Sequence, residues 1–206
     1  MDGIDGPALP WPSSTDIHIW QFDLQTVPPH LPIESWLSPD ERDRAARFKI
    51  TSARDRFILC RGGLRYLLSA YLGCHPATLR FGYGPHGKPY LIAPTSSLQF
   101  NLAHSGLWAI YTISRCQWVG VDIEQMAPLR RLEALIDRCL TATERGALPA
   151  IAAARQQRFF QYWTIKEAHL KAVGLGLSYP MSHIQIALRP MPMIVTPAVL
   201  PDNAIA

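Results

Sequence analysis

An internal repeat with a spacing of about one hundred residues limits the possible folds of this chain most strongly. Leu37–Arg42 (LSPDER) resembles Leu140–Arg145 (LTATER), and the pair Arg56-Phe57 recurs as Arg158-Phe159. The matches occur in the same order and at nearly the same spacing. A repeat of this length indicates two similar structural units in one chain. Chance similarity is the alternative explanation.

The repeated segments carry helix-start signals. Ser38 with Glu41, and Thr141 with Glu144, have the spacing of a capping box, in which a hydroxyl and a glutamate satisfy free N–H groups at a helix start. We therefore predict an α+β fold with two similar halves, residues 1–100 and 101–206. Each half is expected to contain a strand, a capped helix, a longer helix and further strands.

Apolar periodicity places the longer helices and the strands. The spacing predicts helices over Ser52–Leu72 and Ala154–Val173, closed by Gly73 and Gly174. The predicted strands are Leu79–Tyr83, Leu98–Leu102, Trp108–Ser114, Trp118–Glu124 and His183–Leu188. Within the last-but-one of these, Val119–Glu124 matches the apolar-rich run Ile17–Phe22 of the first half at the repeat spacing.

The composition is that of a globular protein. Apolar residues make up 48% and charged residues 17% of the chain, and the formal charge is +4. A modest positive excess favours an acidic partner or a phosphorylated ligand. The four cysteines form no C-x-x-C pair, so neither a zinc site nor a thioredoxin-like motif is indicated. We expect free thiols, since nothing points to secretion, and two disulfides are the alternative. Neither a signal peptide nor an apolar run of ~18 residues is evident, which predicts a cytoplasmic protein with no membrane partner.

Two acidic residues, Asp122 and Glu124, fall on the same face of a predicted strand. Adjacent carboxylates repel each other, and a hard cation such as Mg²⁺, shared with phosphate oxygens of a substrate, relieves that repulsion. The alternative is a solvent-facing strand edge with two ordinary acids.

A third acidic residue, Glu167, shares the apolar face of its helix with Phe160, Trp163 and Leu170. Burial of an unpaired carboxylate is costly, so this position predicts a paired, protonated or metal-bound glutamate. A surface pair with Lys171, four residues later, is the alternative. Lys166 and Lys171 lie on opposite flanks of the helix, and either could meet a phosphate.

Other candidate ligand residues lie in the first half and at the junction of the halves. His104, at a strand end beside the Ser105 hydroxyl, could bind phosphate or act as a base, or could simply cap a turn. Lys88 lies in a tight Gly-Lys-Pro turn with Pro89. A basic run in the first half forms either a solvated helix face or an anion-binding rim. It comprises Arg42, Arg44, Arg47, Arg54, Arg56 and Arg61.

Taken together, these segments resemble the surfactin-type 4′-phosphopantetheinyl transferases, and the resemblance covers about residues 35–188. It rests on Arg56-Phe57 with Arg61, Gly87-Lys88-Pro89, Phe100-Asn101-Leu102-Ala103-His104-Ser105, Gly120-Val121-Asp122-Ile123-Glu124 and Trp163-Thr164-Ile165-Lys166-Glu167-Ala168-His169-Leu170-Lys171-Ala172. The last two motifs define the family. Ala103 departs from it, because many relatives have serine there.

The resemblance implies a pseudo-twofold α+β fold with coenzyme A in the cleft between the halves. Asp122, Glu124 and Glu167 would hold Mg²⁺ against the pyrophosphate, which Lys171 would also contact. The 3′-phosphate end of coenzyme A would meet His104 and Arg56, with Lys88 and Pro89 near the nucleotide. Glu167, or a water on the metal, would deprotonate the acceptor serine.

The implied reaction moves phosphopantetheine from coenzyme A to a serine of an acyl or peptidyl carrier protein, in support of fatty acid, polyketide or nonribosomal peptide biosynthesis. We expect a monomer that binds no nucleic acid. Because relatives usually continue through further strands, the second half is expected to be shortened at its end and less stable, and residues 202–206 resemble the start of such a strand. Two alternatives remain: another Mg²⁺-dependent phosphoester enzyme, and a non-catalytic module that binds carrier proteins or nucleic acid.

Overall fold

A computed structural model describes residues 8–199 of the chain. Its elements, in chain order, are β1 (Ile17–Asp23), α1 (Ile33–Trp36), α2 (Pro39–Ala46), α3 (Thr51–Leu72), η1 (Pro76–Thr78), β2 (Arg80–Tyr83), β3 (Pro89–Ala93), β4 (Leu98–Ser105), β5 (Trp108–Arg115), α4 (Leu132–Cys139), α5 (Ala142–Gly146), α6 (Ala152–Val173), η2 (Gly176–Ser178), η3 (Met181–His183), β6 (Gln185–Ala187) and β7 (Met193–Thr196). Helices and antiparallel sheets occur together, which confirms the predicted mixed α+β class.

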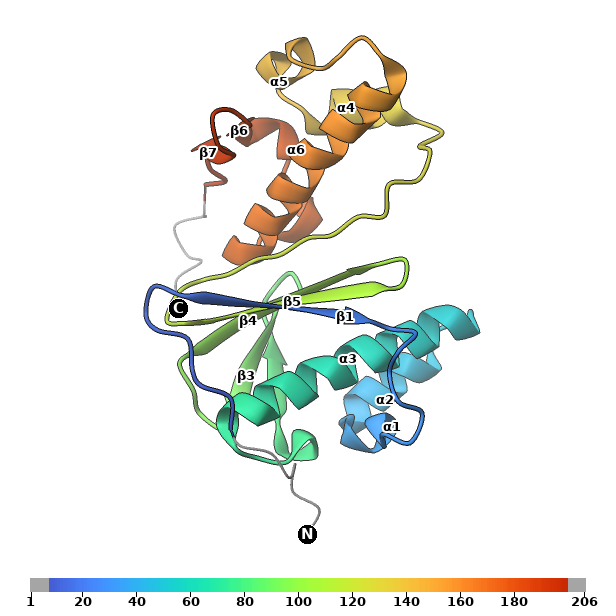
Figure 1. Cartoon of the computed structure of the whole chain (residues 1–206), viewed down its shortest axis with the longest axis vertical. Helices are drawn as coiled ribbons and strands as arrows, with labels where there is room; N and C mark the ends of the chain where they lie inside the picture. Colours follow the sequence, from blue (N-terminus) through green and yellow to red (C-terminus); the bar gives the residue numbers. More distant parts are fainter. Residues whose placement is uncertain (1–7, 200–206) are drawn as a thin grey trace.

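The first half is an antiparallel sheet, in the order β1–β5–β4, packed on the long helix α3 (Figure 1). Buried apolar side chains from both layers form its core, among them Leu64 and Leu68 of α3 and Tyr111 and Ile113 of β5. The hairpin β2–β3 extends from this unit. The predicted boundary between residues 100 and 101 falls inside β4, so the sheet continues across it to Arg115.

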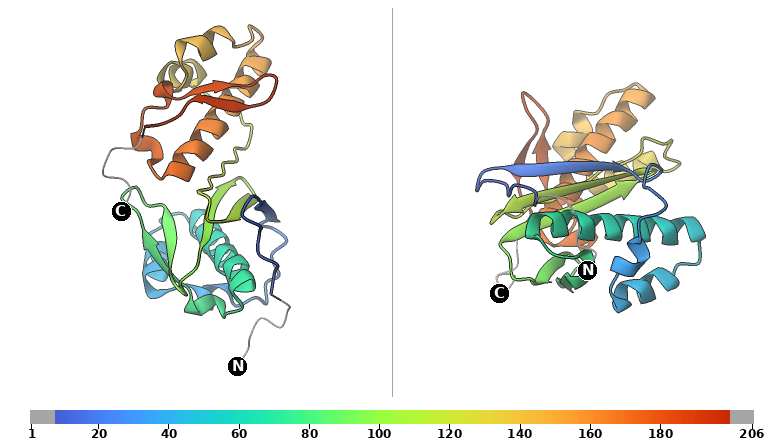
Figure 2. Two further views of the ribbon diagram at one scale, coloured as in Figure 1. Left: turned by 90° about the vertical axis from the view of Figure 1, so that its left-hand side faces the viewer. Right: turned by 60° about the horizontal axis from the view of Figure 1, so that its bottom comes forward.

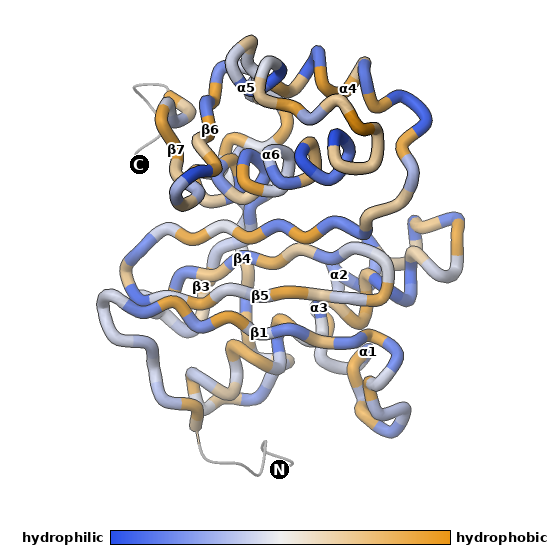
Figure 3. The backbone as a smooth tube through the Cα atoms, turned by 45° about the horizontal axis from the view of Figure 1, so that its top comes forward, coloured by the Kyte–Doolittle hydropathy of each residue, from blue (hydrophilic) through white to orange (hydrophobic). Residues whose placement is uncertain are grey.

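Strand β1 turns His18, Trp20 and Phe22 toward the core and leaves its two isoleucines exposed. Hydropathy alternates along this strand (Figure 3), yet Ile17 and Ile19 are 49% and 65% exposed. His18 and Trp20 point inward instead, because the Tyr71 hydroxyl bonds to both: His18 Nδ1 lies 2.6 Å from it, and the Trp20 indole N–H donates to it at 2.9 Å. The internal hydrogen bonds offset the cost of burying these polar atoms.

The second half is built around α6, with α4 and α5 on one side and the β6–β7 hairpin on the other (Figure 2). A second apolar cluster, which includes Ile136, Phe159, Leu170 and Ile184, forms its core. Strand β6 lies within the predicted strand His183–Leu188, and β7 was not predicted. Residues 202–206 lie outside the described residues.

The helix boundaries follow the sequence signals closely. Both capping boxes form, at Ser38 with Glu41 and at Thr141 with Glu144. Helices α3 and α6 each end in a left-handed glycine, Gly73 with φ 62° and Gly174 with φ 77°. A left-handed conformation at this position closes a helix and is easiest for glycine, so the predicted ends are confirmed.

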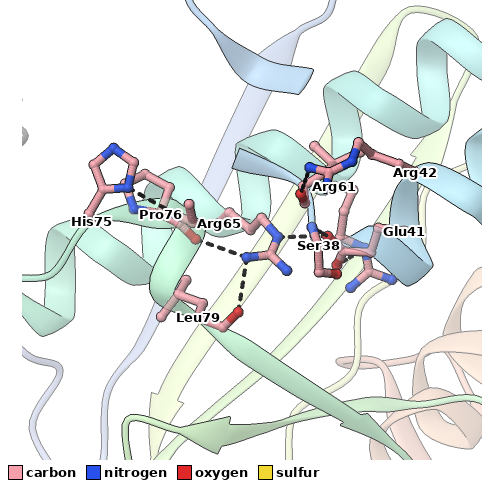
Figure 4. A network of polar contacts seen from close by, with 10 residues as sticks. Ser38, Glu41, Arg42, Arg61, Arg65, His75, Pro76 and Leu79 are labelled. Carbon is pink, nitrogen blue, oxygen red and sulfur yellow. Dashed lines mark hydrogen bonds and ion pairs between the residues drawn. The ribbon is translucent and has the colours of Figure 1, made fainter. Parts of the chain in front are cut away.

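Each capping-box glutamate also forms an ion pair with a buried basic side chain of the following long helix. In the first half, Arg65 Nε donates to Glu41 Oε2 at 2.7 Å, and its guanidinium donates to the carbonyls of Pro76 and Leu79 (Figure 4). In the second half, Lys166 Nζ lies 2.5 Å from Glu144 Oε2. All four side chains are at most 1% exposed.

The predicted strand over Trp118–Glu124 does not form. Between Arg115 and Arg130 the chain is an extended linker without sheet pairing, which runs from the first half to the second (Figures 1 and 2). A strand requires a partner strand, and side chains of β4 supply the hydrogen bonds to this segment instead. The linker therefore keeps the extended shape that the sequence predicts without belonging to a sheet.

Candidate active site

The linker is attached along β4 by two side chains. The buried Asn101 accepts a hydrogen bond from the Val121 N–H at 3.0 Å. At the end of β4, Ser105 Oγ accepts from the Gln125 N–H at 2.9 Å and donates to Glu124 Oε2 at 3.0 Å. These contacts hold the stretch that contains Asp122 and Glu124 against the sheet of the first half.

Helix α6 packs against the same linker from the other half. At Gly120 the approach is so close that a Cβ atom would lie 1.9 Å from the Ala168 carbonyl oxygen. Two residues later, Asp122 Oδ1 accepts a hydrogen bond from Lys171 Nζ at 2.5 Å. Lys171 thus pairs with Asp122, across the junction, rather than forming the surface pair with Glu167 that its spacing also allowed.

Two buried carboxylate oxygens at this junction lack a hydrogen-bond partner: Asp122 Oδ2 and Glu167 Oε1. Burial, as the main cause, raises the pKa of both carboxyl groups above their ordinary values, and the Glu124 charge adds to this. The neighbouring Lys171 ammonium acts in the opposite direction. The burial of Glu167 on the apolar face of α6 is as the sequence predicted, with 7% exposed.

The two unpartnered oxygens are the atoms at this junction that a cation could bind. Hard divalent cations bind carboxylate oxygens, and Mg²⁺ commonly takes only one or two of them together with substrate phosphates. Within residues 8–199, no three acidic, histidine or cysteine side chains are arranged as a complete metal centre. The described structure thus supplies two unpartnered carboxylate oxygens at the junction, but it does not gather Asp122, Glu124 and Glu167 into one set of metal ligands.

Basic groups line the same region. Burial lowers the pKa of His104, at the end of β4, and the positive charges of Arg56 and Lys171 lower it further, whereas Glu124 acts in the opposite direction. Arg56 comes from α3 and Lys171 from α6, so residues of both halves act on this imidazole. The structure thus places His104 within electrostatic reach of both Arg56 and Lys171.

Lys166 corrects one sequence-based expectation. Its ammonium is fully buried and donates to Glu144, to the Cys139 carbonyl at 2.8 Å and to the Met181 carbonyl at 3.1 Å. All three N–H groups have partners, so this lysine is not available to a phosphate. The sequence signal that could have shown this is the repeat, since Arg65 pairs with a capping-box glutamate in the same way.

Comparison with known proteins supplies the decisive observation. Residues 118–192, which contain the linker acids and α6, match the family described as the 4′-phosphopantetheinyl transferase superfamily. The chain is 38% identical over 181 residues to 4′-phosphopantetheinyl transferase HetI of Nostoc sp., covering 86% of this chain and 76% of that protein. The chain belongs to the 4′-phosphopantetheinyl transferase family.

Two further relatives are consistent with this assignment. The phosphopantetheinyl transferase of Thraustochytrium sp. is 28% identical over 84% of this chain and 66% of its own length. The 4′-phosphopantetheinyl transferase Sfp of Bacillus subtilis is 31% identical over 75% of this chain and 67% of its own length. This chain is therefore a transferase of the holo-acyl-carrier-protein synthase type.

The family assignment leaves two predicted cofactor-binding residues in an unexpected setting. Lys88 and Pro89 lie at the β2–β3 turn, and the Lys88 ammonium donates to the carbonyls of Val119 and Ala172. In this transferase Lys88 therefore contacts backbone atoms of the other half.

No helix within residues 8–199 combines the length and apolar character needed to cross a bilayer.

Proposed function

We propose that this transferase is of the surfactin type and moves phosphopantetheine from coenzyme A to a serine of an acyl or peptidyl carrier protein, releasing 3′,5′-ADP. The observation that carries the proposal is the pair of unpartnered, buried oxygens of Asp122 and Glu167 beside Lys171. The segment that holds all three residues, within 118–192, matches the model of the 4′-phosphopantetheinyl transferase superfamily.

The binding of coenzyme A is assigned to residues of both halves. Arg56 and His104 would meet the 3′-phosphate end, and the Ser105 hydroxyl lies at the same end of β4. Lys171 extends from α6 into the junction with its side chain 28% exposed, so its ammonium can reach a pyrophosphate. Charge-assisted bonds from fixed cations suit a ligand that carries several phosphates.

Mg²⁺ is the cation that best fits the acidic residues, with Asp122, Glu124 and Glu167 as the side chains that would hold it. When bound, it would supply Lewis-acid stabilisation of charge on the phosphate oxygens. The raised pKa values of Asp122 and Glu167 support this assignment, because a cation would stabilise the ionised carboxylates that burial disfavours.

The transfer step needs an acceptor for the serine proton and a cation beside the leaving group. The serine oxygen forms a bond to the β-phosphorus of coenzyme A, and the bond from that phosphorus to the bridging oxygen breaks. Glu167, whose pKa is raised by burial, takes the serine proton. Negative charge develops on the departing 3′,5′-ADP, and the Lys171 ammonium stabilises it.

The proposal includes a duplicated, pseudo-twofold architecture. Its support is the matched pairs Glu41–Arg65 and Glu144–Lys166, each joining a capping-box glutamate to a buried cation of the next long helix. The halves differ around these pairs, because the first has a three-stranded sheet over its long helix and the second has a linker and a hairpin.

Transfer to a carrier protein tests the function directly. The protein is incubated with coenzyme A, Mg²⁺ and an apo carrier protein, and the carrier is weighed by mass spectrometry. We expect the carrier to gain the mass of one phosphopantetheine arm, and Asp122→Asn to lower the rate by about 10²–10³-fold, as for loss of one charge-stabilising group.

A surface variant controls for the general effect of losing an acid. Asp137→Asn changes an exposed residue of α4 and should leave the rate unchanged. Wild-type protein that transfers nothing to several carriers, or that hydrolyses phosphoesters with Mg²⁺ and without coenzyme A, would contradict the proposal. Hydrolysis would indicate a different phosphoester enzyme.

A further inference from the structure

The tip of the β2–β3 hairpin, residues 84–89, packs against the C-terminal end of α6. Lys88 Nζ donates to the Ala172 carbonyl at 2.6 Å and to the Val119 carbonyl at 3.2 Å. His86 Nδ1 lies 3.3 Å from Ser178 Oγ. The hairpin belongs to the first half, whereas Ala172 and Ser178 belong to the second, so these contacts join the halves.

The acceptors of Lys88 explain why a lysine suits this position. The Ala172 carbonyl is in the last turn of α6, where carbonyl groups have no partner within the helix. The C-terminal end of a helix also carries partial negative charge, which favours a cation there. Val119 is buried in the linker, so one ammonium group joins the helix end and the linker.

The Lys88 contacts lie next to the active-site residues on both chain segments. Lys171 precedes Ala172 on α6, and Val119 lies three residues before Asp122 on the linker. Asp122 and Lys171 are themselves joined at 2.5 Å. A group that holds Val119 and Ala172 together therefore fixes the segments that place this carboxylate beside this ammonium.

We propose that Lys88 is a positioning residue that clamps the β2–β3 hairpin to the linker and to the end of α6, and so holds the two halves at the spacing the active site requires. This inference rests on the proposed function for its catalytic consequence. It assigns Lys88 to the interface between the halves, in place of the nucleotide contact that the family resemblance implied.

The cost of this arrangement supports a specific role. The ammonium is partly buried and is bonded to neutral carbonyls, so desolvation lowers the pKa of Lys88 to about 8. A buried charge without a counter-charge is unfavourable, so the two carbonyl acceptors compensate for only part of this cost. In return, the Lys88 ammonium donates hydrogen bonds to two backbone carbonyls that belong to different segments of the chain.

Hydrogen exchange of the protein without coenzyme A tests the clamp. In Lys88→Met, amides of the linker around Val119 and of the chain just after Ala172 should exchange at least about tenfold faster than in the wild type, as expected when a charge-assisted contact is lost. Amides in the core of α3 should not change. Lys88→Gln, which keeps N–H donors without the charge, should show a smaller effect and serves also if Lys88→Met does not fold.

Two further measurements separate the clamp from a nucleotide contact. Arg80→Met removes an exposed cation of the same hairpin and should leave exchange unchanged. In Lys88→Met, kcat for transfer should fall more than the KM for coenzyme A rises. Unchanged exchange would overturn the clamp, and if coenzyme A then bound at least about tenfold more weakly, Lys88 would be a nucleotide contact. Absence of transfer by the wild type would overturn the proposed function alone, since exchange is measured without substrate.

Discussion

At the scale of single residues, the junction between the halves combines groups that are individually unfavourable. Asp122 and Glu167 each have a buried oxygen without a partner, and Lys88 places an ammonium among carbonyls. Such groups lower stability unless a ligand or an interface compensates for them. All three groups lie where the linker meets α6. Other buried polar atoms without a hydrogen-bond partner lie mainly around Glu41, Arg61 and Arg65 of the first half.

The desolvation of the Lys88 ammonium, which lowers its pKa, predicts that the stability of the protein depends on pH. Its pKa is about 8 in the folded protein and 10.5 ordinarily, so between these values the unfolded chain binds more protons than the folded chain. Stability conferred by this residue therefore rises with pH across the window from about 8 to 10.5. Urea unfolding at several pH values should show the wild type gaining stability relative to Lys88→Met above pH 8. A constant difference between the two proteins would contradict this.

At the scale of elements, the paired networks at Glu41 and Glu144 fix how each long helix sits on its neighbours. Glu144 Oε2 accepts from Lys166 and from the Thr141 N–H, while Oε1 accepts from the Ile186 N–H at 2.8 Å. One carboxylate thus links α5, α6 and β6. Because the network is buried and its charges are balanced, removal of one partner leaves a charge without compensation.

This network predicts strong coupling between Lys166 and Glu144. Lys166→Met should lower the free energy of unfolding by about 3–5 kcal/mol, since it strands a buried carboxylate. The double variant Lys166→Met/Glu144→Gln should lose clearly less than the sum of the single losses. Urea unfolding of all four proteins gives the coupling energy. Arg65→Met with Glu41→Gln provides the corresponding cycle in the first half, where Arg61 Nε, 3.4 Å from Glu41 Oε1, remains as a second counter-charge. Losses that add to within about 0.5 kcal/mol would show that the two side chains act independently.

The elements also show how far the sequence could predict the structure. Capping boxes and terminal glycines are local signals, so the bounds of α3 and α6 were predicted to within two residues. The linker was predicted as a strand because hydrogen bonding depends on distant partners, and here Asn101 and Ser105 replace a partner strand. Likewise, His18 and Trp20 point inward because they hydrogen-bond to the Tyr71 hydroxyl. The hydropathy pattern along β1 contains no information about this distant partner.

For the candidate site, sequence reasoning identified the acids and lysines but not their partners. Asp122, Glu167 and Lys171 were selected from spacing and from family resemblance, and the structure brings Asp122 and Lys171 into contact. The role of Lys88 was not predictable, because its acceptors are backbone carbonyls far along the chain. A carbonyl is present at every residue, so its use as a partner leaves no trace in the sequence.

At the scale of the whole molecule, the halves have separate cores and meet through the linker, α6 and the hairpin tip (Figures 1 and 2). Interfaces of this kind between units of one chain allow relative motion unless specific contacts hold them. The groups proposed for the active site come from both halves, so under that proposal the spacing of the halves determines whether they meet. Contacts at the junction should therefore affect catalysis more than they affect the stability of either core.

Gly120 provides the sharpest test of that expectation. A Cβ atom there would lie 1.9 Å from the Ala168 carbonyl oxygen and 2.4 Å from the Ala172 nitrogen, so Gly120→Ala must push the linker away from α6. The displacement moves Asp122 away from Lys171, and a misplacement of about 1 Å can lower a rate by about 10²-fold. We expect a loss of that size in kcat/KM for the carrier protein, with the exchange protection of α3 unchanged.

The matched control is Gly146→Ala in α5, where a Cβ atom would meet no other atom within 4 Å. This variant should keep wild-type activity and gain a little stability from its higher helix propensity, at most about 1 kcal/mol. Circular dichroism melts and carrier-loading rates are measured on both variants. They distinguish an effect specific to position 120 from a general effect of replacing a glycine by alanine. If Gly120→Ala kept wild-type kcat/KM, the close approach of the linker to α6 would not be what places the catalytic groups.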